Sequence, residues 1–484
     1  MNITLTQLQQ WLPQAVVANA ALGDALNQTV RIQAIRTDSR HVVPGDLFVA
    51  LKGDNFDGAA FMLQAQTQGA AALLFEAADL QNANVLKNLQ GVSIPAFAVP
   101  NARQALGELA MQWRRQFDVS LIGVTGSNGK TTVTQMIAAI LRADGAQPSM
   151  STQGNLNNEI GVPLTLFNLR AKHRRAVIEL GMNHPGEIEV LARYAQPTVG
   201  LVNNAQREHQ EFMATVEAVA RENGEVIRAL PASGVAVFPA ADAYTSVWQT
   251  LAGQRKVMTF GFELGDVQAH HLTWTAGAWQ FTLVAASEAL PCRLNIAGRH
   301  NVLNALAATA CALAAGMQLH DIVKGLESFE PVNGRSKASE WQLANHAFTL
   351  VDDTYNANPD SVRAAIDVLA ELPGPRLLVL GDMGEVGQQG PEFHAEVGAY
   401  AKSSGIDALF TLGDLCAHSS QAFAGSQHFE SMSSLQDAVL SQVSNYKSVV
   451  VKGSRFMKME RVVQSLHAVT QTAQTTQSEV AHAA

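Results

Sequence analysis

The chain has 484 residues, of which 47% are hydrophobic, enough for about three cores at the usual ~100–200 residues per domain. Its 42 acidic residues outnumber 33 basic ones, which gives a net charge of −9. No Lys/Arg-rich run is present that could neutralise a nucleic-acid backbone. These features predict a globular protein and exclude nucleic acid as an expected partner.

The N-terminal stretch and the cysteines indicate the cellular compartment in which the protein is expected. MNITLTQLQQWLPQ has neither the cationic start nor the apolar region of a signal peptide, and the longest apolar stretch, around 305–315, falls short of the ~20 residues that span a bilayer. Cys292, Cys311 and Cys416 are widely spaced and odd in number, which favours reduced thiols over disulfides or a zinc site. We therefore expect a cytoplasmic protein that does not insert into a membrane. A monomer is expected as well.

Short apolar runs alternate with Ala/Leu-rich stretches of helical character. These runs occupy 121–124, 176–180, 199–204, 234–238, 348–353, 376–382, 407–413 and 448–454. Continuous apolar strands separated by helices are typical of parallel sheets that are covered on both faces. The pattern predicts an α/β protein.

Two breaks divide the chain. Pro100 follows the run SIPAFAV and closes a first block, and ESFEPVNGR (327–335) has the Pro and Gly content of a linker. We therefore expect domains at 1–100, 101–330 and 331–484. The polar tail, 468–484, is poor in core residues and is expected to be mobile.

The segment VSLIGVTGSNGKTTVT (119–134) has the form of a phosphate-binding loop between a strand and a helix. Gly126 and Gly129 would allow successive N–H groups to face one anion, to which the helix N-terminus and Lys130 add positive charge. Thr131 could place its hydroxyl on Mg²⁺. The strict pattern has another glycine where Val124 stands, so a plain Gly/Asn turn is the alternative. The GTPase pattern NKxD and the kinase patterns HRD and DFG are absent, which disfavours those two classes.

Charged residues recur at the expected strand ends. Glu179 ends AVIEL, Asp353 ends FTLVDD, Lys452 ends the apolar part of SVVVKGS, and His209 follows VGLVNN. Strand ends are where doubly wound sheets bind ligands. A single histidine there is more often a surface or capping residue, but the set together predicts a cleft that holds a nucleotide and a charged substrate.

Several motifs together resemble the ATP-dependent Mur ligases, which build the peptide of bacterial peptidoglycan. These are TDSRHVVPGDLFVALKGDNFDGAAF (37–61), GVTGSNGKTT, AVIELGMNHPGEI, LVNNAQREH, AGRHNVLNALAA, PVNGR and DDTYNANPDS, in this order over nearly the whole chain. The resemblance implies an N-terminal α/β uridine-nucleotide-binding domain, a central P-loop ATPase domain with a mostly parallel sheet, and a C-terminal Rossmann-like domain. NLNNEIGVPLT, MNHPGEI and DDTYNANPDS are similar to the member that joins D-alanyl-D-alanine to UDP-N-acetylmuramoyl-tripeptide through an acyl phosphate.

The resemblance also assigns roles to individual residues, with ATP and Mg²⁺ as cofactors. It implies catalytic roles for Lys130, Glu179, His209 and Arg335 and metal binding by Thr131, Glu179 and His209. The implied ATP-binding residues are Thr125, Gly126, Ser127, Asn128, Gly129, Lys130, Thr131, Thr132, Asn301, Asn304, Arg335 and Asp353. The implied substrate-binding residues are Thr37, Ser39, Arg40, Asn155, Asn157, Asn158, Tyr355, Asn356 and Lys452.

One position departs from the family. Many members carry a lysine that is carbamylated and supports the second metal, and Asn223, fourteen residues after His209, stands in its place. An amide does not react with CO₂, so Glu222 or Glu225 is expected to compensate.

Three alternatives stay open at this point. The chain could be another Mur ligase that adds a different amino acid, or a folylpolyglutamate synthetase, although the latter is not expected to carry the uridine-binding block. A nucleotide-gated binding protein without turnover is the third alternative. Whether the third peptide residue of the substrate is meso-diaminopimelate or L-lysine also stays open.

Overall fold

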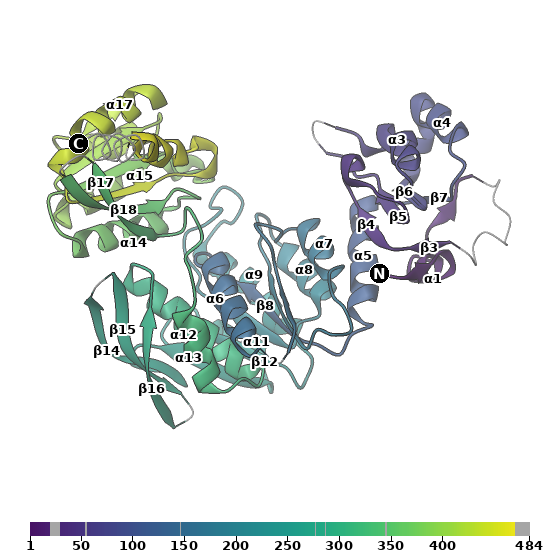
Figure 1. Cartoon of the computed structure of the whole chain (residues 1–484), viewed down its shortest axis with the longest axis horizontal. Coiled ribbons are helices and arrows are strands. Elements are labelled where there is room, and N and C mark those ends of the chain that lie inside the picture. Colours follow the sequence, from purple (N-terminus) through teal and green to yellow (C-terminus); the bar gives the residue numbers. More distant parts are fainter. Residues whose placement is uncertain are drawn as a thin grey trace, which may run out of the picture.

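A computed structural model describes residues 1–19, 30–53, 56–145, 147–275, 277–285, 287–343 and 346–469. The chain forms three α/β units, one after another along the sequence (Figure 1). Among the described residues, no helix is long and apolar enough to cross a membrane. Most of the tail that was expected to be mobile, 468–484, lies outside the described residues, and 468–469 still belong to a helix.

The central unit is built on a nine-stranded sheet. Its order is β16 (Glu288–Leu294), β15 (Ala278–Ala285), β14 (Val267–Thr275), β13 (Lys256–Gly261), β12 (Val235–Pro239), β11 (Val199–Val202), β8 (Ser120–Thr125), β10 (Arg175–Glu179) and β9 (Ser149–Ser151). The strands from β14 to β9 pair in parallel, whereas β15 pairs antiparallel with both β14 and β16. The sheet is therefore mostly parallel, as predicted.

Helices cover both faces of this sheet, which explains why its parallel strands are apolar throughout. On β10, Val177 faces one core while Ala176 and Ile178 face the other. The first core includes α6 (Lys130–Ala143), α12 (Arg299–Ala314) and α13 (Leu319–Glu327). The second includes α5 (Ala102–Arg114), α7 (Gly161–Leu166), α8 (Glu187–Ala195), α9 (Val216–Asn223), α10 (Glu225–Arg228) and α11 (Thr245–Ala252).

The C-terminal unit has a six-stranded sheet. Its order is β17 (Lys337–Leu343), β18 (His346–Asp353), β22 (Ser448–Lys452), β19 (Arg376–Gly381), β20 (Ala408–Leu412) and β21 (Gln427–Phe429), and only the β17–β18 pair is antiparallel. One face packs on α14 (Pro359–Glu371), α15 (Gly390–Ser403) and α16 (Cys416–Ala422). The other packs on α17 (Met432–Gln442) and the helical residues that follow 459. Parallel strands covered on both faces make this the predicted Rossmann-like unit.

The N-terminal unit has a five-stranded sheet in the order β2 (Val16–Val17), β7 (Ala96–Val99), β6 (Ala72–Glu76), β5 (Asp46–Val49) and β4 (Ala34–Arg36). A two-stranded ribbon of β1 (Ile3–Thr4) and β3 (Arg31–Ile32) lies beside α1 (Leu5–Trp11), and α3 (Met62–Thr67) and α4 (Ala83–Gln90) complete the unit. The core on the α5 side is continuous with that of the central unit, because Leu5 and Leu8 share a cluster with Leu106 and Leu109. The three-domain α/β fold is thus confirmed.

Candidate functional site

The predicted phosphate-binding segment is a loop between a strand and a helix. β8 ends at Thr125 and α6 begins at Lys130. Gly126 and Gly129 have φ of 135° and 82°, a region that residues with a side chain rarely adopt. A Cβ on Gly129 would also lie 2.5 Å from Asn304 Oδ1. Both glycines are therefore required by the path of the loop.

Val124, at the position where the strict pattern has glycine, belongs to the strand and not to the loop. It pairs with Glu179 of β10 and with Leu201 of β11, and its side chain is fully buried. A glycine at this position would make no turn, because the backbone is still held in the sheet on both sides. The loop is shorter than in the strict pattern, because its turn starts at Gly126 and not at position 124.

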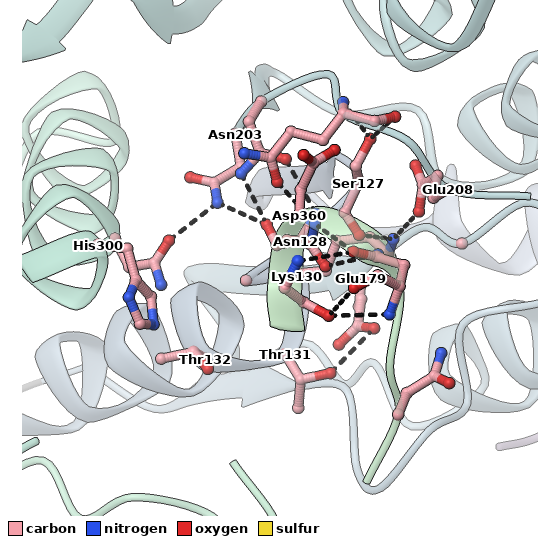
Figure 2. Close-up of a pocket in the computed structure, with 18 of the residues that line it drawn as sticks. Ser127, Asn128, Lys130, Thr131, Thr132, Glu179, Asn203, Glu208, His300 and Asp360 are labelled. Carbon is pink, nitrogen blue, oxygen red and sulfur yellow. Dashed lines mark hydrogen bonds and ion pairs between the residues drawn. The ribbon is translucent and has the colours of Figure 1, made fainter. Parts of the chain in front are cut away.

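Lys130 concentrates positive charge at the start of α6. Its Nζ donates to the carbonyl oxygens of Gly126 and Ser127, at 2.5 and 3.1 Å. It also lies 3.2 Å from Oε2 of Glu208, which Figure 2 shows near the loop. The first-turn N–H groups of a helix have no acceptor within it and add partial positive charge. The arrangement attracts an anion to this end of the helix.

Glu179 lies next to this loop, at the end of β10. Its Oε1 accepts a hydrogen bond from Thr131 Oγ1 at 3.2 Å (Figure 2). The same oxygen accepts from Asn157 Nδ2 at 2.8 Å. Its Oε2 is buried and has no hydrogen-bond partner among the described residues. Oxygen donors of this kind suit Mg²⁺. The Thr131–Glu179 pair therefore fits the magnesium site that the resemblance implies.

A second buried carboxylate, Glu208, also lines the cavity. The Glu208 side chain is 5% exposed, its Oε2 contacts Lys130, and its Oε1 has no partner among the described residues. His209 Nε2 lies 3.7 Å from the same Oε2, and His209 Nδ1 lies 2.6 Å from Glu385 Oε2 of the C-terminal unit. The contact with His209 lowers the pKa of Glu385 below its ordinary value, although burial opposes this shift. A chain of acidic and basic groups therefore crosses between the two units.

The amides predicted to bind adenine form a hydrogen-bonded relay to the loop. Asn301 Nδ2 donates to the carbonyl oxygen of Ala297, and Asn304 Nδ2 donates to Asn301 Oδ1. Asn203 Nδ2 in turn donates to Asn304 Oδ1 and to the carbonyl oxygen of Asn128. Asn301 and Asn304 line the cavity and are buried, so their clearest role in the structure is to hold α12 against the phosphate-binding loop.

The C-terminal unit contributes one wall of the cavity. Asp353 and Lys452 end the neighbouring strands β18 and β22, and Lys452 Nζ donates to Asp353 Oδ2 at 2.5 Å and to the carbonyl oxygen of Asn356 at 2.9 Å. Burial opposes ionisation of Asp353, but the charge and hydrogen bond of Lys452, helped by His300 and the N–H of Ser336, together outweigh it and lower the pKa of Asp353. Lys452, which was predicted to bind substrate, thus positions Asp353.

Arg335 joins the two units at the phosphate-binding loop. Its Nη2 donates to Thr131 Oγ1 at 3.2 Å, and its guanidinium lies 3.8 Å from the ring centroid of Tyr355. A guanidinium held over an aromatic ring at this distance makes a cation–π contact, which helps to fix the direction in which the arginine points. The structure therefore brings Arg335 to the phosphate-binding loop, and its catalytic role stays a prediction.

The asparagines of NLNNEIG differ in their positions. Asn157 holds Glu179, and Asn158 Oδ1 accepts from the N–H of Gly161 at the start of α7; both line the cavity. Asn155 is exposed and is not among the lining residues. Thr125 and Gly126 do not line the cavity either: the Thr125 hydroxyl donates to carbonyl oxygens of Leu201 and Asn223. None of these three residues therefore lines the cavity that they were predicted to contact.

The predicted uridine-binding residues lie outside the main cavity. Arg40 is exposed and forms a bidentate ion pair with Asp38, which lowers the pKa of that carboxyl. Ser39 is buried beside Gln64, and Thr37 is half-buried. Arg103 lines the cavity and donates to the carbonyl oxygen of Lys52 in the N-terminal unit. The N-terminal residues could therefore hold only a part of the substrate that extends beyond the cavity.

Asn223 packs beneath the loop. Its Oδ1 accepts from the N–H of Gly126 at 2.9 Å, and the residue is buried. The two glutamates expected to compensate for the missing lysine point elsewhere: Glu222 accepts from the N–H of Ile188, and Glu225 pairs with Arg228. Neither lines the cavity, so that expectation is wrong.

These elements enclose a cavity of about 1420 Å³ between the central and C-terminal units. Sequence reasoning missed several of its residues, among them Asn203, Gln206, Glu208, Asp360 and Glu385. Glu208 stands beside His209 in REHQEF, and that position was the available signal. The sequence around Glu385 carries no such signal, because only the approach of the two units brings Glu385 to His209.

Comparisons with known proteins identify the family of the chain. Three family models match: the Mur ligase family, catalytic domain, over 31–114, the Mur ligase middle domain over 124–312, and the Mur ligase, glutamate ligase domain over 340–455. UDP-N-acetylmuramoyl-tripeptide–D-alanyl-D-alanine ligase of Escherichia coli (strain K12) is 38% identical over 470 residues, with 96% of this chain and 98% of that protein covered.

The chain is also similar to solved structures. A crystal structure of MurF from Acinetobacter baumannii is 34% identical with a TM-score of 0.87, covering 96% of this chain and 99% of that one. MurF ligase from Thermotoga maritima in complex with ADP is 25% identical with a TM-score of 0.79, covering 93% and 100%. The chain belongs to the Mur ligase family.

Proposed function

We propose that this cavity is where the chain joins D-alanyl-D-alanine to UDP-N-acetylmuramoyl-tripeptide and converts ATP to ADP and phosphate. The chain is an ATP-dependent ligase of peptidoglycan precursor synthesis. The observation that carries the assignment of the site is the contact of Arg335 with Thr131, at 3.2 Å. It brings a cation of the C-terminal unit to the phosphate-binding loop of the central unit, so both units act on one set of phosphates.

ATP is needed because a carboxylate is a poor electrophile. In the proposed first step, an oxygen of the tripeptide's terminal carboxylate attacks the γ-phosphorus of ATP, the bond to the β-phosphate oxygen breaks, and ADP leaves. The free amine of D-alanyl-D-alanine then attacks the acyl carbon of the acyl phosphate. Phosphate departs with the electron pair of the broken C–O bond, the amine loses a proton, and an amide remains.

The residues of the loop supply charge compensation for this transfer. All reactants of the first step are anionic, so positioning and positive charge provide most of the catalysis. Lys130 and the first N–H groups of α6 would hold the phosphates from one side and Arg335 from the other. Thr131 and Glu179 would hold Mg²⁺, which supplies Lewis-acid polarisation of the phosphates when bound.

The remaining predicted residues fit the ends of the substrates. Asp353, kept ionised by Lys452, would accept hydrogen bonds from the ribose hydroxyls of ATP. Thr37, Ser39 and Arg40 would meet the uridine diphosphate, for which Arg40 would have to exchange its pairing with Asp38 for a phosphate. Tyr355, Asn356, Asn157 and Asn158 would contact the peptide. A monomer in the cytoplasm belongs to the same proposal, and the three free, buried cysteines suit a reducing compartment.

The test is ADP release with ATP, UDP-N-acetylmuramoyl-tripeptide and D-alanyl-D-alanine, each omitted in turn. We expect turnover only with all three together. Robust ADP release with a folate and glutamate instead would favour a folylpolyglutamate synthetase. ATP binding without release of ADP under any of these conditions would favour a nucleotide-gated binding protein.

A further inference from the structure

We propose that Arg103 and Glu159 together bind the far end of the third peptide residue of the nucleotide substrate, and that they select meso-diaminopimelate over L-lysine there. Arg103 would pair with the carboxylate of diaminopimelate that does not react, and Glu159 would pair with the ammonium beside it. The inference rests on the proposed function and names the substrate class of the same cavity. Sequence reasoning selected neither residue.

Arg103 lies where the N-terminal unit meets the cavity. It belongs to the first turn of α5, whose first N–H, from Ala102, donates to Glu76 Oε1 at the end of β6 (Figure 1). Arg103 Nη2 donates to the carbonyl oxygen of Lys52 in the N-terminal unit at 2.7 Å, and its Nη1 lies 2.5 Å from Glu159 Oε1 of the central unit. Arg103 and Glu159 both line the cavity. A substrate held by the N-terminal unit and by the phosphate-binding loop would extend along this wall.

The other lysine and arginine side chains of the cavity wall have places elsewhere. Lys130 and Arg335 reach the phosphate-binding loop, Lys452 is held in its ion pair at the end of β22, and the guanidinium of Arg299 lies 4.6 Å from the ring centroid of Phe262. Among the described lining residues, this leaves Arg103 as the strong cation on the side of the N-terminal unit. A carboxylate of the peptide that is not the reacting one would find its partner there.

The Arg103–Glu159 ion pair is open to exchange with a ligand. Its side chains are 39% and 51% exposed, and exposed ion pairs of this kind contribute little to stability. The hydrogen bond from Nη2 to the Lys52 carbonyl oxygen keeps the guanidinium aimed while Nη1 turns to another acceptor. Arginine presents its N–H donors in a rigid plane that matches a carboxylate.

The two side chains are complementary to a free amino-acid group. At its far end, diaminopimelate carries an ammonium and a carboxylate on one carbon, whereas L-lysine carries only the ammonium at that position. With diaminopimelate, Arg103 and Glu159 each meet an opposite charge. With L-lysine, Glu159 meets the ammonium and leaves Arg103 without an anionic partner, so the pair discriminates against L-lysine.

The position of the pair fits the length of such a residue. Asn157 Nδ2 donates to Glu179 Oε1, beside the phosphate-binding loop where the reacting carboxylate would lie. Glu159 is two residues farther along the same loop, at most about 7 Å of backbone. This separation is of the size of the carbon chain between the two ends of diaminopimelate. One residue can therefore present its reacting carboxylate to the loop and its far end to Arg103.

The test is the affinity of the full chain for two nucleotides, UDP-N-acetylmuramoyl-tripeptide ending in meso-diaminopimelate and the same nucleotide ending in L-lysine, by calorimetry without ATP. We expect wild type to bind the diaminopimelate form about tenfold more tightly, the effect of one charge-assisted hydrogen bond. Arg103→Met should lose this preference by weakening the diaminopimelate form alone. Glu159→Gln should weaken both forms alike, since both present the ammonium.

Arg115→Met is the matched control. It makes the same substitution at the other end of α5, at an exposed residue that is not among those lining the cavity. Its affinities and its preference should equal those of wild type. Circular dichroism checks that each variant is folded.

Two results would overturn the proposal. The first is equal affinity of wild type for the two nucleotides. The second is an equal loss for both in folded Arg103→Met, which would make Arg103 only a contact between the N-terminal and central units. The measurement needs no turnover, so either result would leave the ligase assignment standing. Binding of neither nucleotide by wild type, together with no turnover, would instead overturn the proposed function itself.

Discussion

Lys130 brings a full positive charge to the point where the loop turns into α6. Its Nζ contacts two loop carbonyl oxygens and Glu208, so it is held where a phosphate would meet it. We expect Lys130→Ala to lower turnover by about 10³-fold, because one charge is lost at the transferring phosphoryl group. The measurement is steady-state ADP release, with thermal unfolding as the control for folding. Near-normal turnover in a folded variant would refute this role.

Asp353 makes stability depend on pH in a defined direction. Its pKa lies below the ordinary value of 3.8 in the folded protein, so ionised Asp353 stabilises the fold above that pH. This contribution is lost as pH falls through the folded pKa. Asp353→Asn leaves Lys452 buried and unpaired, which we expect to cost about 3 kcal/mol near neutral pH.

The check is the thermal midpoint of wild type and Asp353→Asn from about pH 7 to about pH 3. The gap between the two proteins should be largest near neutrality and should narrow below pH 3.8. A gap that stays constant over this range would show that the Asp353–Lys452 pair does not carry the effect.

Candidate site residues that belong to a local sequence motif could be selected from the sequence. Site residues whose position depends on a partner distant in the sequence could not. Gly129 and Lys130 follow from the loop pattern, and Glu179 follows from its place at a strand end. Glu208 was overlooked because its ion-pair partner, Lys130, is 78 residues away in the sequence. Lys452 was found at a strand end, but its pairing with Asp353 was not, since adjacency of β18 and β22 is a property of the sheet.

At the scale of elements, strands with a continuous apolar run were predictable, whereas the hairpin strands and some shorter or less apolar parallel strands, such as β9, β13 and β21, were not. All eight apolar runs that were identified correspond to strands of the central and C-terminal sheets. The hairpin strands β14 and β15 were missed because their residues alternate between buried and exposed, as in HLTWT and AWQFTLV, and lack a continuous apolar run. The domain boundaries at 100 and 330 stay predictions.

Val124 allows a test of whether position 124 belongs to the strand or to the phosphate-binding loop. The strict loop pattern has glycine here, but this side chain is fully buried in a strand that is paired on both sides. We expect Val124→Gly to destabilise the protein by about 3 kcal/mol, from lost burial and added backbone freedom.

The measurement combines thermal unfolding with ATP binding by calorimetry. Val124→Ala serves as the control that removes most of the side chain without the backbone freedom of glycine, and it should fall between wild type and Val124→Gly. Tighter ATP binding by Val124→Gly than by wild type would mean that position 124 belongs to the loop after all.

At the scale of the whole molecule, contacts between the central and C-terminal units decide whether the site is complete. Arg207 of the central unit pairs with Asp360 and with Glu396, each at 2.7 Å. Asn358, which caps α14, donates to Asn128 of the loop at 2.9 Å. Arg335 and Glu385 reach the loop and His209 across the same boundary. The contacts between the two units therefore include residues of the phosphate-binding site itself.

Arg207 is the residue through which this coupling can be tested. We expect Arg207→Met to shift the balance between closed and open arrangements about tenfold toward open, since its ion pairs are partly exposed and each contributes modestly. Arg363→Met is the matched control, because Arg363 also pairs with Glu396 but lies within the C-terminal unit. The measurement is the radius of gyration from solution scattering, with and without a non-hydrolysable ATP analogue and UDP-N-acetylmuramoyl-tripeptide.

Wild type and Arg363→Met should become more compact when both ligands bind, as domains hinged around a ligand commonly do. Arg207→Met should need higher ligand concentrations to reach the same dimensions, and its KM for both ligands should rise while turnover at saturation changes little. The reason is that Arg207 touches neither loop nor substrate, so its loss weakens closure but leaves the closed site intact. Identical ligand titrations for Arg207→Met and Arg363→Met would show that closure depends on the loop contacts of Arg335 and Asn358 instead.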